Sequence, residues 1–576
     1  MTKQRGFKGR LTAYGDPGFS FYLRKAFAKS MGYTDEELGR PVIGIANTFS
    51  DLVSCQGTAP QLVQAVKRGV VAAGGLPLEF PTISLGEPFL TPSSMLLRNL
   101  LSMDTEEMVR RQPIDVVVLI GGCDKIVPAQ LMAVASADIP AIMVVTGPMM
   151  TGSYRGERLG ACTDCRRFWS EHRGGRIDAA EIDTISGNLC PTAGTCMVMG
   201  TASTMACVTE ALGMMLPGGA AIPAVYSDRM RHAQESGVRA VALAKEELTP
   251  SKIMTPKAFT NALRVLLAIG GSTNGIVHLT AMARRRGIAL DFEAFDRMSR
   301  ETPVLVDLKP NGLHYMEDLY RAGGLLPVLR ELKPLLHLDC LTVTGRTLGE
   351  EIEAGRPPFK QDIVRPRSNP IYAEGGLAVL RGSLAPDGAI IKQSAATPRL
   401  LKHEGRAVVF NSLDDIVARL DDDSLNITPD DVLVLQNAGP KGAPGMPEAG
   451  YLPIPKRLAR DGVKDMVRIS DARMSGTAFG TVVLHISPEA ASGGPLALVK
   501  TNDRIRLDVE ARRIDLLVEA DELGRRREAW RPPAAHEGAE RGYLRLYLEH
   551  VQQAHQGADF DFLSATAMTA TTPVWP

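Results

Sequence analysis

Residues 115–125 read DVVVLIGGCDK, a continuous apolar run that ends in two glycines, a cysteine, an aspartate and a lysine. A run of this length without alternation predicts a strand buried on both faces, as in a parallel sheet. Cys123 would then lie at the carboxyl end of that strand, the edge where open α/β sheets form their ligand crevices. The stretch therefore predicts the fold class and the side of the sheet that carries chemistry.

The elements around this stretch alternate in a regular rhythm. Short apolar runs predict strands at residues 41–47, 115–122 and 141–147, and helical patterns fill residues 58–73, 94–111 and 128–137. This alternation predicts a mostly parallel sheet covered by helices on both faces, which is a three-layer α/β domain. Residues 256–335 are mainly helical in pattern, with 257–268 the clearest case.

The pattern changes at residues 355–370, GRPPFKQDIVRPRSNP, which are rich in proline and charge and have no apolar period. We interpret this stretch as a linker. Short strand patterns follow at 377–380, 406–411, 431–436, 467–470, 481–487, 496–500 and 504–509, and a closed or partly closed β domain fits them. The predicted organisation is an α/β domain over residues 1–365 and a β-barrel-like domain over residues 366–576.

Composition excludes several classes of protein. The chain has 576 residues, 44% of them hydrophobic, with 65 basic and 65 acidic side chains. That content excludes intrinsic disorder, and the balanced charge argues against a nucleic-acid binder. The chain starts without the apolar segment of a secretory signal, and residues 195–226 predict a buried helix followed by a buried strand rather than a membrane span. We expect a cytoplasmic protein whose eight cysteines are not in disulfides.

Three cysteines stand where loops should leave the sheet. Cys123 follows the buried strand, Cys55 in NTFSDLVSCQG lies between a strand and a helix, and Cys196 in PTAGTCMVMG precedes an expected helix. Three thiolates around one crevice suit an iron–sulfur cluster with one iron open to substrate. Spacing alone favours the simpler interpretation, buried cysteines that pack as small apolar residues. Cys162 and Cys165 form a CxxC pair without a second pair nearby, so reduced loop thiols are favoured over zinc or redox chemistry.

Oxygen ligands accompany these thiols. Asp124 and Lys125 adjoin Cys123, Glu87 lies in SLGEPF, and Glu448 lies in GAPGMPEAG. Carboxylates from separate segments are what a Mg²⁺ site needs. Taken one at a time, such residues are more often solvated surface groups.

A glycine-flanked loop supplies the remaining candidates. In SDARMSGTAFG, residues 470–480, Ser475 or Thr477 could act as a nucleophile or a base, provided that a neighbouring cation stabilises the alkoxide. The alternative is a turn with local side-chain capping. His278 and His314 lack metal-ligand spacing and are expected to be core or hydrogen-bonded histidines.

Several segments, taken together, carry a family resemblance. In chain order they are NTFSDLVSCQG, SLGEPF, GGCDK, PTAGTCMVMGTASTMAC, GGSTN, GAPGMPEAG, SDARMSGTAFG and HISPEAASGGPLALV. Over nearly the whole chain they resemble the family of dihydroxy-acid dehydratases and 6-phosphogluconate dehydratases. SLGE, ACTDCRRFW and GYLRLYLEHVQQAHQGADFDFL are most similar to its sugar-acid branch, the pentonate dehydratases. This implies a hydro-lyase that converts an aldonate such as L-arabinonate into a 2-keto-3-deoxy acid.

The resemblance also implies a site. Three residues would hold a [2Fe–2S] cluster, or alternatively [4Fe–4S]: Cys55, Cys123 and Cys196. Four would bind Mg²⁺: Glu87, Asp124, Glu448 and a carbamylated Lys125. Burial would lower the lysine pKa and so give the neutral amine that carbamylation needs. Ser475, as its alkoxide, would remove the C2 proton and Thr477 would help to bind substrate, with Mg²⁺ on the carboxylate and C2 oxygen and iron acting as Lewis acid on the C3 hydroxyl.

Other interpretations remain open at this point. A branched-chain 2,3-dihydroxy-acid dehydratase would use the same chemistry in a drier pocket, and a 6-phosphogluconate enzyme would need a basic phosphate subsite. A non-catalytic iron–sulfur protein would need the cysteines but not Glu87, Glu448 and Ser475. The resemblance implies a homodimer or homotetramer acting on a small molecule, with neither nucleic acid nor membrane as a partner.

Overall fold

A four-stranded parallel sheet forms the centre of the first half of the molecule. The computed structural model describes residues 6–12 and 14–565. The strands are β1 (Val42–Asn47), β2 (Leu76–Pro81), β3 (Val116–Gly121) and β4 (Ala141–Val145), in the order β2-β1-β3-β4. All three neighbouring pairs are parallel, and every residue of β3 is buried. The parallel α/β domain predicted from the sequence is confirmed.

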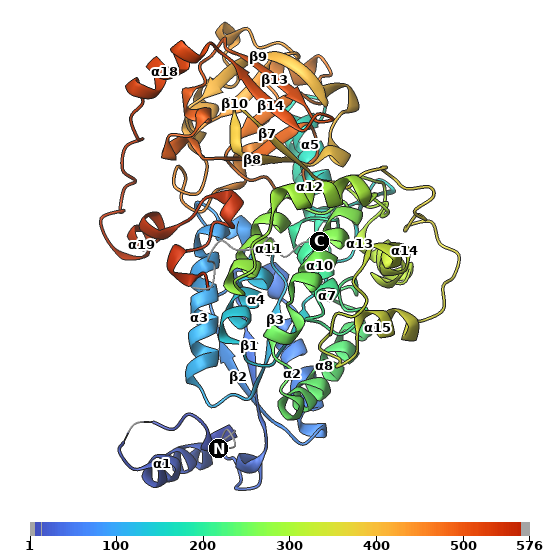
Figure 1. Ribbon diagram of the computed structural model, residues 1–576. Helices are drawn as coiled ribbons and strands as arrows, with labels where there is room; N and C mark the ends of the chain where they lie inside the picture. The colour runs from blue at the N-terminus through green and yellow to red at the C-terminus, as the bar shows by residue number, and fades with distance from the viewer. Residues whose placement is uncertain (1–5, 13, 566–576) are drawn as a thin grey trace.

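Helices cover both faces of this sheet (Figure 1). Because strand crossovers are right-handed and the chain moves from β1 to β2 and then back past β1 to β3, α2 (Ala59–Ala72) lies on one face and α3 (Arg98–Arg111) on the other. The helix α8 (Ser227–Glu246) packs against α2 so closely that a Cβ on Gly237 would lie 2.3 Å from the Val66 carbonyl oxygen.

The strand order places a topological switch point between β1 and β3. The chain leaves β1 in one direction along the sheet and leaves β3 in the other. Loops at the carboxyl ends of two such strands diverge, and the gap between them is where open α/β sheets bind ligands. The loop after β1 contains Cys55 and the loop after β3 contains Cys123, so the predicted thiols stand at this point.

Other helices complete the first half of the chain. Three of them pass through the core: α4 (Ile126–Ala137), α7 (Thr201–Ala211) and α10 (Pro256–Ala268), with α11 (Asn274–Arg285) beside them. The remaining elements are α1 (Pro17–Ser30), β5 (Gly152–Tyr154), β6 (Glu157–Leu159), α5 (Thr163–Arg173), α6 (Ala179–Leu189), α9 (Pro250–Ile253), α12 (Phe292–Glu301), α13 (Met316–Arg321), α14 (Leu326–Leu332) and α15 (Leu348–Ala354).

A closed eight-stranded barrel forms the second half, with the order β10-β11-β12-β8-β7-β14-β13-β9. Its strands are β7 (Ala378–Gly382), β8 (Ala385–Ile391), β9 (Lys402–Phe410), β10 (Val432–Leu435), β11 (Val467–Ser470), β12 (Val482–Ser487), β13 (Arg504–Asp508) and β14 (Arg513–Leu517). The helices α16 (Leu413–Arg419), α17 (Lys456–Arg460), α18 (Ala520–Ala529) and α19 (Gly542–His550) accompany it. Closure confirms the predicted barrel and leaves no open sheet edge in it.

The end of the chain returns to the first half of the molecule, where α19 lies beside α3 (Figure 1). Tyr543 donates a hydrogen bond to the Leu96 carbonyl at 2.8 Å. Asp559 accepts two hydrogen bonds from Arg285, at 2.5 and 3.1 Å, and both side chains are fully buried. The last described segment is therefore part of the packing of the α/β half.

Some predicted elements are wrong. Residues 212–226 are mostly buried but form no strand, because prolines and glycines interrupt the chain there. The strand expected at 496–500 is instead a short 3-10 helix, Pro495–Leu498. Five strands have no counterpart in the sequence prediction: β2, β5, β6, β8 and β14.

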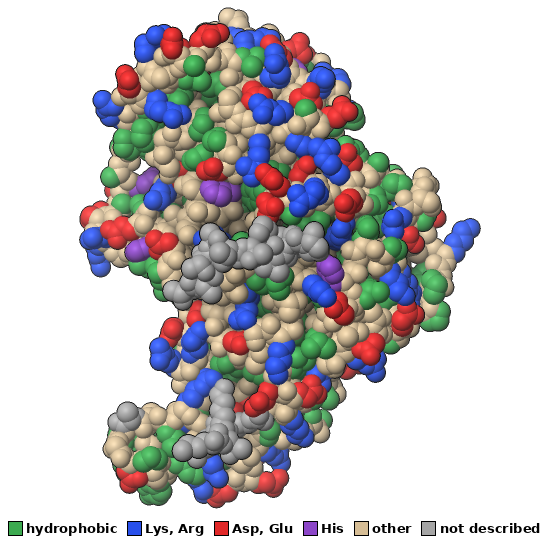
Figure 2. Space-filling model, in the orientation of Figure 1, with side chains coloured by type: hydrophobic (Ala, Val, Ile, Leu, Met, Phe, Trp, Pro, Cys, Tyr) green, Lys and Arg blue, Asp and Glu red, His purple; other side chains and the backbone are tan. Residues whose placement is uncertain are grey.

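The surface and the helices agree with the composition. Figure 2 shows acidic and basic side chains mixed over the visible face, without one dominant sign. Within the described residues, none of the helices combines the length and the apolar character needed to cross a membrane.

Candidate active site

Cys55 and Cys123 meet because the backbone passes very close at Gly122. A Cβ on Gly122 would lie 1.7 Å from the Thr146 hydroxyl oxygen and 3.2 Å from the Cys55 carbonyl oxygen, so only glycine fits. The same Thr146 hydroxyl donates a hydrogen bond to that carbonyl at 2.7 Å. The Cys55 thiol interacts directly with Cys123 and, together with burial, raises the pKa of the Cys123 thiol. The two thiols predicted to share a crevice do lie together.

Cys196 joins the same edge but not at a helix terminus. The helix α7 begins five positions later, after Gly200, so Cys196 precedes the helix, as expected, but does not lie at its N-terminus. Cys196 contacts Cys162, and this contact and burial raise its pKa, with Cys55 close enough to contribute. Cys162 also interacts with Cys165 in the first turn of α5. The CxxC pair therefore packs directly against a predicted cluster ligand.

Three carboxylates surround the ammonium group of Lys125, which is fully buried. Its Nζ lies 3.4 Å from Glu87, 3.4 Å from Glu448, and in contact with Asp124. Burial and the nearby Arg473 lower the pKa of Lys125, but the three carboxylates outweigh them and hold it above its ordinary value. The carboxylates therefore favour the protonated ammonium of Lys125, and the neutral amine expected beside a bound metal stays a prediction.

Glu87 is fixed by a second layer of donors. Ser93 donates to it at 3.0 Å, and both the backbone and the hydroxyl of Ser94 also donate to it. Burial raises the pKa of Glu87, yet Lys125, Arg473 and these hydrogen bonds lower it to about 2. Glu87 is thus an anion throughout the working pH range.

Arg473 is a site residue that the sequence analysis missed. It is fully buried, donates to the Ser93 hydroxyl at 2.9 Å, and lies 3.3 Å from Glu448. It belongs to the glycine-flanked segment SDARMSGTAFG. In such a segment the sequence does not distinguish a buried arginine from an arginine on the surface. With Lys125, it sets two cations against three carboxylates, so the cluster carries a net negative charge that suits a metal cation.

The loop with Ser475 and Thr477 connects β11 to β12 and reaches this cluster from the barrel. The two hydroxyl oxygens are 2.8 Å apart. Asn274 Nδ2 donates to the Met474 carbonyl at 3.1 Å and to Glu448 at 3.4 Å. Thr163, inside the CxxC segment, donates to the Thr477 carbonyl at 2.9 Å. Ser475 is therefore held between the carboxylates and the thiols.

The loop is also pressed against the α/β half. A Cβ on Gly476 would lie 2.6 Å from Ser272 Cβ, and a Cβ on Gly200 would lie 2.8 Å from Thr477 Cγ2. Asn274 and Ser272 belong to the GGSTN segment, which was noticed in the sequence but given no role.

The two histidines have different environments. His278 is fully buried and pairs with Arg98 at 3.1 Å, which confirms the predicted core role. His314 keeps 38% of its side chain exposed, near Asp307 and Asp318, so its surroundings are polar and partly solvated.

The donor chemistry at this edge matches two kinds of metal group. Among the described residues, no three His, Cys, Asp or Glu side chains already form a group that could hold a metal ion. The carboxylates nevertheless converge on a buried cation, Lys125, so hard oxygen donors are directed at a cationic centre. The thiols beside them are soft donors that suit iron. The residues present therefore fit both groups.

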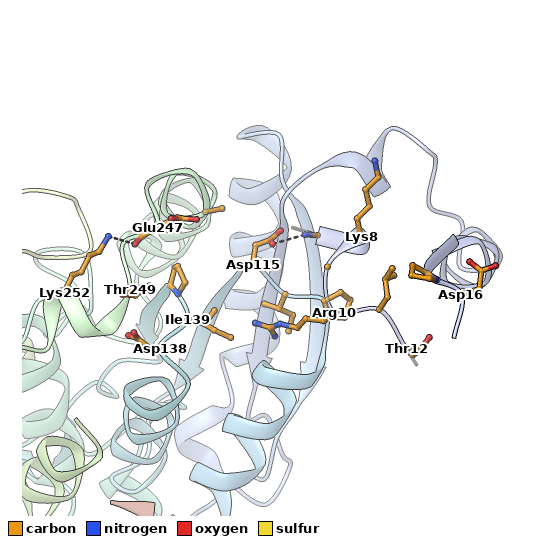
Figure 3. Close-up of a pocket in the computed structure, with 18 of the residues that line it drawn as sticks. Lys8, Arg10, Thr12, Asp16, Asp115, Asp138, Ile139, Glu247, Thr249 and Lys252 are labelled. Carbon is orange, nitrogen blue, oxygen red and sulfur yellow. Dashed lines mark hydrogen bonds between the residues drawn. The ribbon is translucent and has the colours of Figure 1, made fainter. Parts of the chain in front are cut away.

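A separate cavity of about 1380 Å³ lies at the opposite, amino-terminal edge of the sheet. Figure 3 shows the Arg10 side chain of the N-terminal segment pointing towards Ile139, which like Asp138 precedes β4, while Asp16 lies at the far side of the cavity. Chemistry in parallel sheets belongs to the carboxyl ends of the strands. This cavity is therefore distinct from the candidate active site.

Comparisons with known proteins agree with this arrangement. Residues 40–351 match the description "Dihydroxy-acid/6-phosphogluconate dehydratase N-terminal", and residues 362–558 match its C-terminal counterpart. The chain is 50% identical to an L-arabonate dehydratase of Azospirillum brasilense, with 95% of each chain covered. It is 46% identical to a 6-deoxy-6-sulfo-D-gluconate dehydratase of Pseudomonas putida (94% of this chain, 93% of the relative). It is 41% identical to a dihydroxy-acid dehydratase of Pyrococcus abyssi (93% and 97%). The chain belongs to the dihydroxy-acid/6-phosphogluconate dehydratase family.

Proposed function

We propose that this enzyme removes water from a sugar acid, an aldonate such as L-arabinonate or another pentonate or hexonate, to give a 2-keto-3-deoxy acid. One observation carries the proposal. Asn274 binds both Glu448 and the carbonyl next to Ser475, so the proposed base and the proposed metal ligands are held in one fixed relation. A dehydratase needs this relation, because the proton to be removed lies beside the carboxylate that the metal binds.

Ser475 is the residue that we propose as the base. Its side chain is half-buried, so substrate can reach it, and its hydroxyl is oriented by Thr477 at 2.8 Å. As an alkoxide, Ser475 would take the C2 proton of the substrate. Thr477 would stabilise the negative charge of that alkoxide through its hydroxyl and would also bind a substrate oxygen.

We further propose the resident cofactors. A [2Fe–2S] cluster, or alternatively [4Fe–4S], would be held by Cys55, Cys123 and Cys196. Mg²⁺ would be held by four residues: Glu87, Asp124, Glu448 and Lys125 as its carbamate. When bound, these groups supply Lewis acidity towards the oxygen atoms of the substrate. Because the carboxylates raise the pKa of Lys125, we propose that it becomes carbamylated only together with metal loading.

Polar walls favour a sugar acid over a branched-chain substrate. Ser93, Thr201, Ser272 and Asn274 are all buried near Glu448 or the serine loop. Polar surroundings of this kind suit a substrate with several hydroxyl groups better than one with an alkyl side chain. The names of the relatives point the same way, since the two sugar-acid enzymes are 50% and 46% identical and the dihydroxy-acid enzyme 41%.

The proposal is tested with anaerobically prepared, Mg²⁺-supplied enzyme and a substrate panel. The panel holds L-arabinonate, D-xylonate, D-gluconate, D-galactonate, 6-phosphogluconate and 2,3-dihydroxyisovalerate, with 2-keto acid formation as the readout. We expect a pentonate or hexonate to have the highest kcat/KM. Preference for dihydroxyisovalerate would move the enzyme to the branched-chain class. Ser475→Ala should abolish turnover and leave the visible absorbance of the cluster intact; unchanged turnover would remove Ser475 from its proposed role.

We also propose a homodimer or homotetramer, working in the cytoplasm, with the two domains divided near residue 365. The helix α1 offers a surface for a second copy, because Phe19, Tyr22 and Phe27 on it are 46%, 68% and 67% exposed. Light scattering coupled to gel filtration measures the oligomeric state. Limited proteolysis around residues 355–370 tests the domain division.

A further inference from the structure

Lys392 is a fully buried lysine to which the proposed function assigns no role. It follows β8, and its Nζ lies 3.4 Å from the carbonyl oxygen of Gly476, the residue between Ser475 and Thr477. An ammonium group has three hydrogen-bond donors. The 3.4 Å contact with Gly476 is the one hydrogen bond that Nζ makes within the described residues.

Among residues 6–12 and 14–565, no acidic side chain forms an ion pair with Lys392. The charged groups on neighbouring segments are paired with one another: Arg512 with Asp296 and Glu374, and Arg468 with Asp465. Within the part of the chain that the structure describes, none of them forms an ion pair with Lys392. A buried charge without a partner is costly, and a lysine in this position sheds its proton more readily.

The chain provides an internal comparison. Lys125 is equally buried, but its three carboxylates raise its pKa. For Lys392 burial is the cause that acts, and it lowers the pKa to about 7. Lys125 therefore keeps its proton at neutral pH, whereas Lys392 can bind and release a proton in that range.

The position of Lys392 is fixed relative to the serine loop. The Ala395 carbonyl accepts a hydrogen bond from the backbone of Gly480 at 2.8 Å, and Thr397 N donates to the Thr481 hydroxyl at 3.2 Å. These bonds tie the segment after β8 to the loop that carries Ser475. Loop and lysine form one unit within the barrel.

We propose that Lys392 accepts the hydroxyl proton of Ser475 and so generates the alkoxide base. The O–H bond of Ser475 breaks and an N–H bond forms on Lys392, directly after a rotation of the serine side chain or through one water molecule. The alkoxide then takes the C2 proton and is a hydroxyl again. The departing hydroxide then takes the proton of the Ser475 hydroxyl and leaves as water, and Lys392 returns its extra proton to Ser475, which restores both the serine hydroxyl and the free amine. Lys392 acts through Ser475 and does not touch the substrate.

The inference rests on the proposed function and is tested in the cofactor-loaded enzyme. Lys392→Met keeps the length of the side chain and removes the amine. We expect kcat to fall by about 10²- to 10⁴-fold, the usual contribution of a proton acceptor, with KM changed by less than about threefold and the cluster absorbance unchanged. The wild-type kcat should rise with pH through about 7 as Lys392 loses its proton, whereas the residual activity of the variant should keep rising to higher pH.

Lys392→Arg separates proton transfer from simple charge. A guanidinium keeps its proton at every working pH, so this variant should be as inactive as Lys392→Met. High activity of Lys392→Arg would show that only positive charge matters and would overturn the proposal. Lys257→Met, an exposed lysine far from the site, is the matched control and should behave as wild type.

Chemical rescue covers the case in which Lys392→Met folds poorly. In Lys392→Ala, added methylamine or ethylamine should restore part of kcat, with a dependence on amine basicity. Absence of rescue in a folded, cluster-containing variant counts against the proposal. If the wild-type enzyme is active and Lys392→Met is equally active, the role of Lys392 is refuted and the proposed function stands. If the wild-type enzyme turns over no member of the substrate panel, the proposed function is refuted as well.

Discussion

Replacing Thr163 by valine should slow the reaction without removing any proposed ligand or base. Valine has nearly the shape of threonine but cannot donate the hydrogen bond to the Thr477 carbonyl, which is 2.9 Å long. Thr163 is 8% exposed and Thr477 2% exposed. The carbonyl would therefore lose its partner in a place that water reaches poorly.

The size of the effect follows from that burial. An unsatisfied buried polar group costs about 1–3 kcal/mol. If the serine loop relieves this cost by shifting, the loss falls on the transition state, because Ser475 must stand at a fixed distance from the C2 proton. At 1.36 kcal/mol per factor of ten, kcat should fall about 5- to 150-fold.

The assay compares kcat, KM and thermal stability in Thr163→Val and in a matched control. Thr260 is also buried and also donates to a backbone carbonyl, that of Pro256 at 3.1 Å, but it lies in α10 away from the serine loop. Thr260→Val should lower the Tm by a similar amount and leave kcat unchanged. If Thr163→Val also lowers only the Tm, the bond supports the fold and does not position the loop, and the reasoning fails.

Three further perturbations test other parts of the structure. Glu448→Gln should raise the Mg²⁺ concentration for half-maximal activity at least ~10-fold, as loss of even an outer metal partner does, and a Mg²⁺ titration by calorimetry measures this without turnover. Burial and Arg229 lower the pKa of His232 from 6.5 to about 4. The unfolded state therefore binds more protons than the folded state between these pH values, and the free energy of unfolding falls by about 1.4 kcal/mol per unit as the pH drops from 6.5 to 4. His232→Gln should flatten this pH dependence in urea titrations, and an unchanged slope would contradict the role of His232. Arg285→Met should destabilise the protein by about 3–5 kcal/mol because it leaves Asp559 buried and unpaired, and the double variant with Asp559→Leu should recover part of that loss.

Sequence patterns found the elements that are buried on all sides. The runs that end in Gly121 and Val145 consist almost entirely of apolar residues, so burial on both faces of a sheet follows from the sequence alone. β2, LPLEFP, was missed because its two prolines argue against a strand, and it tolerates them at the edge of the sheet. β8, APDGAII, was missed because it starts with turn residues, and only closure of the barrel recruits it.

The candidate site divides in a similar way. Cys55 and Cys123 could be brought to one edge from sequence because each lies in the loop that follows a strand of one sheet. Only the family resemblance, and no local pattern, placed Glu448 beside Lys125, because the two meet through contact between the barrel and the α/β half. The carboxylates around Lys125 could not be predicted from local pattern for the same reason: burial acts locally, while two of the carboxylates that raise its pKa come from distant segments.

The pairing of Arg285 with Asp559 bears on how the enzyme is made. The two residues are 274 positions apart, and both are fully buried in the finished protein. During synthesis Arg285 leaves the ribosome long before Asp559 does, so the helix α11 is translated well ahead of its buried counter-ion. Packing of the amino-terminal half is thus completed by a segment that is translated after the barrel. A chain that stopped before Asp559 would leave Arg285 buried without this partner, in the half that carries the thiols.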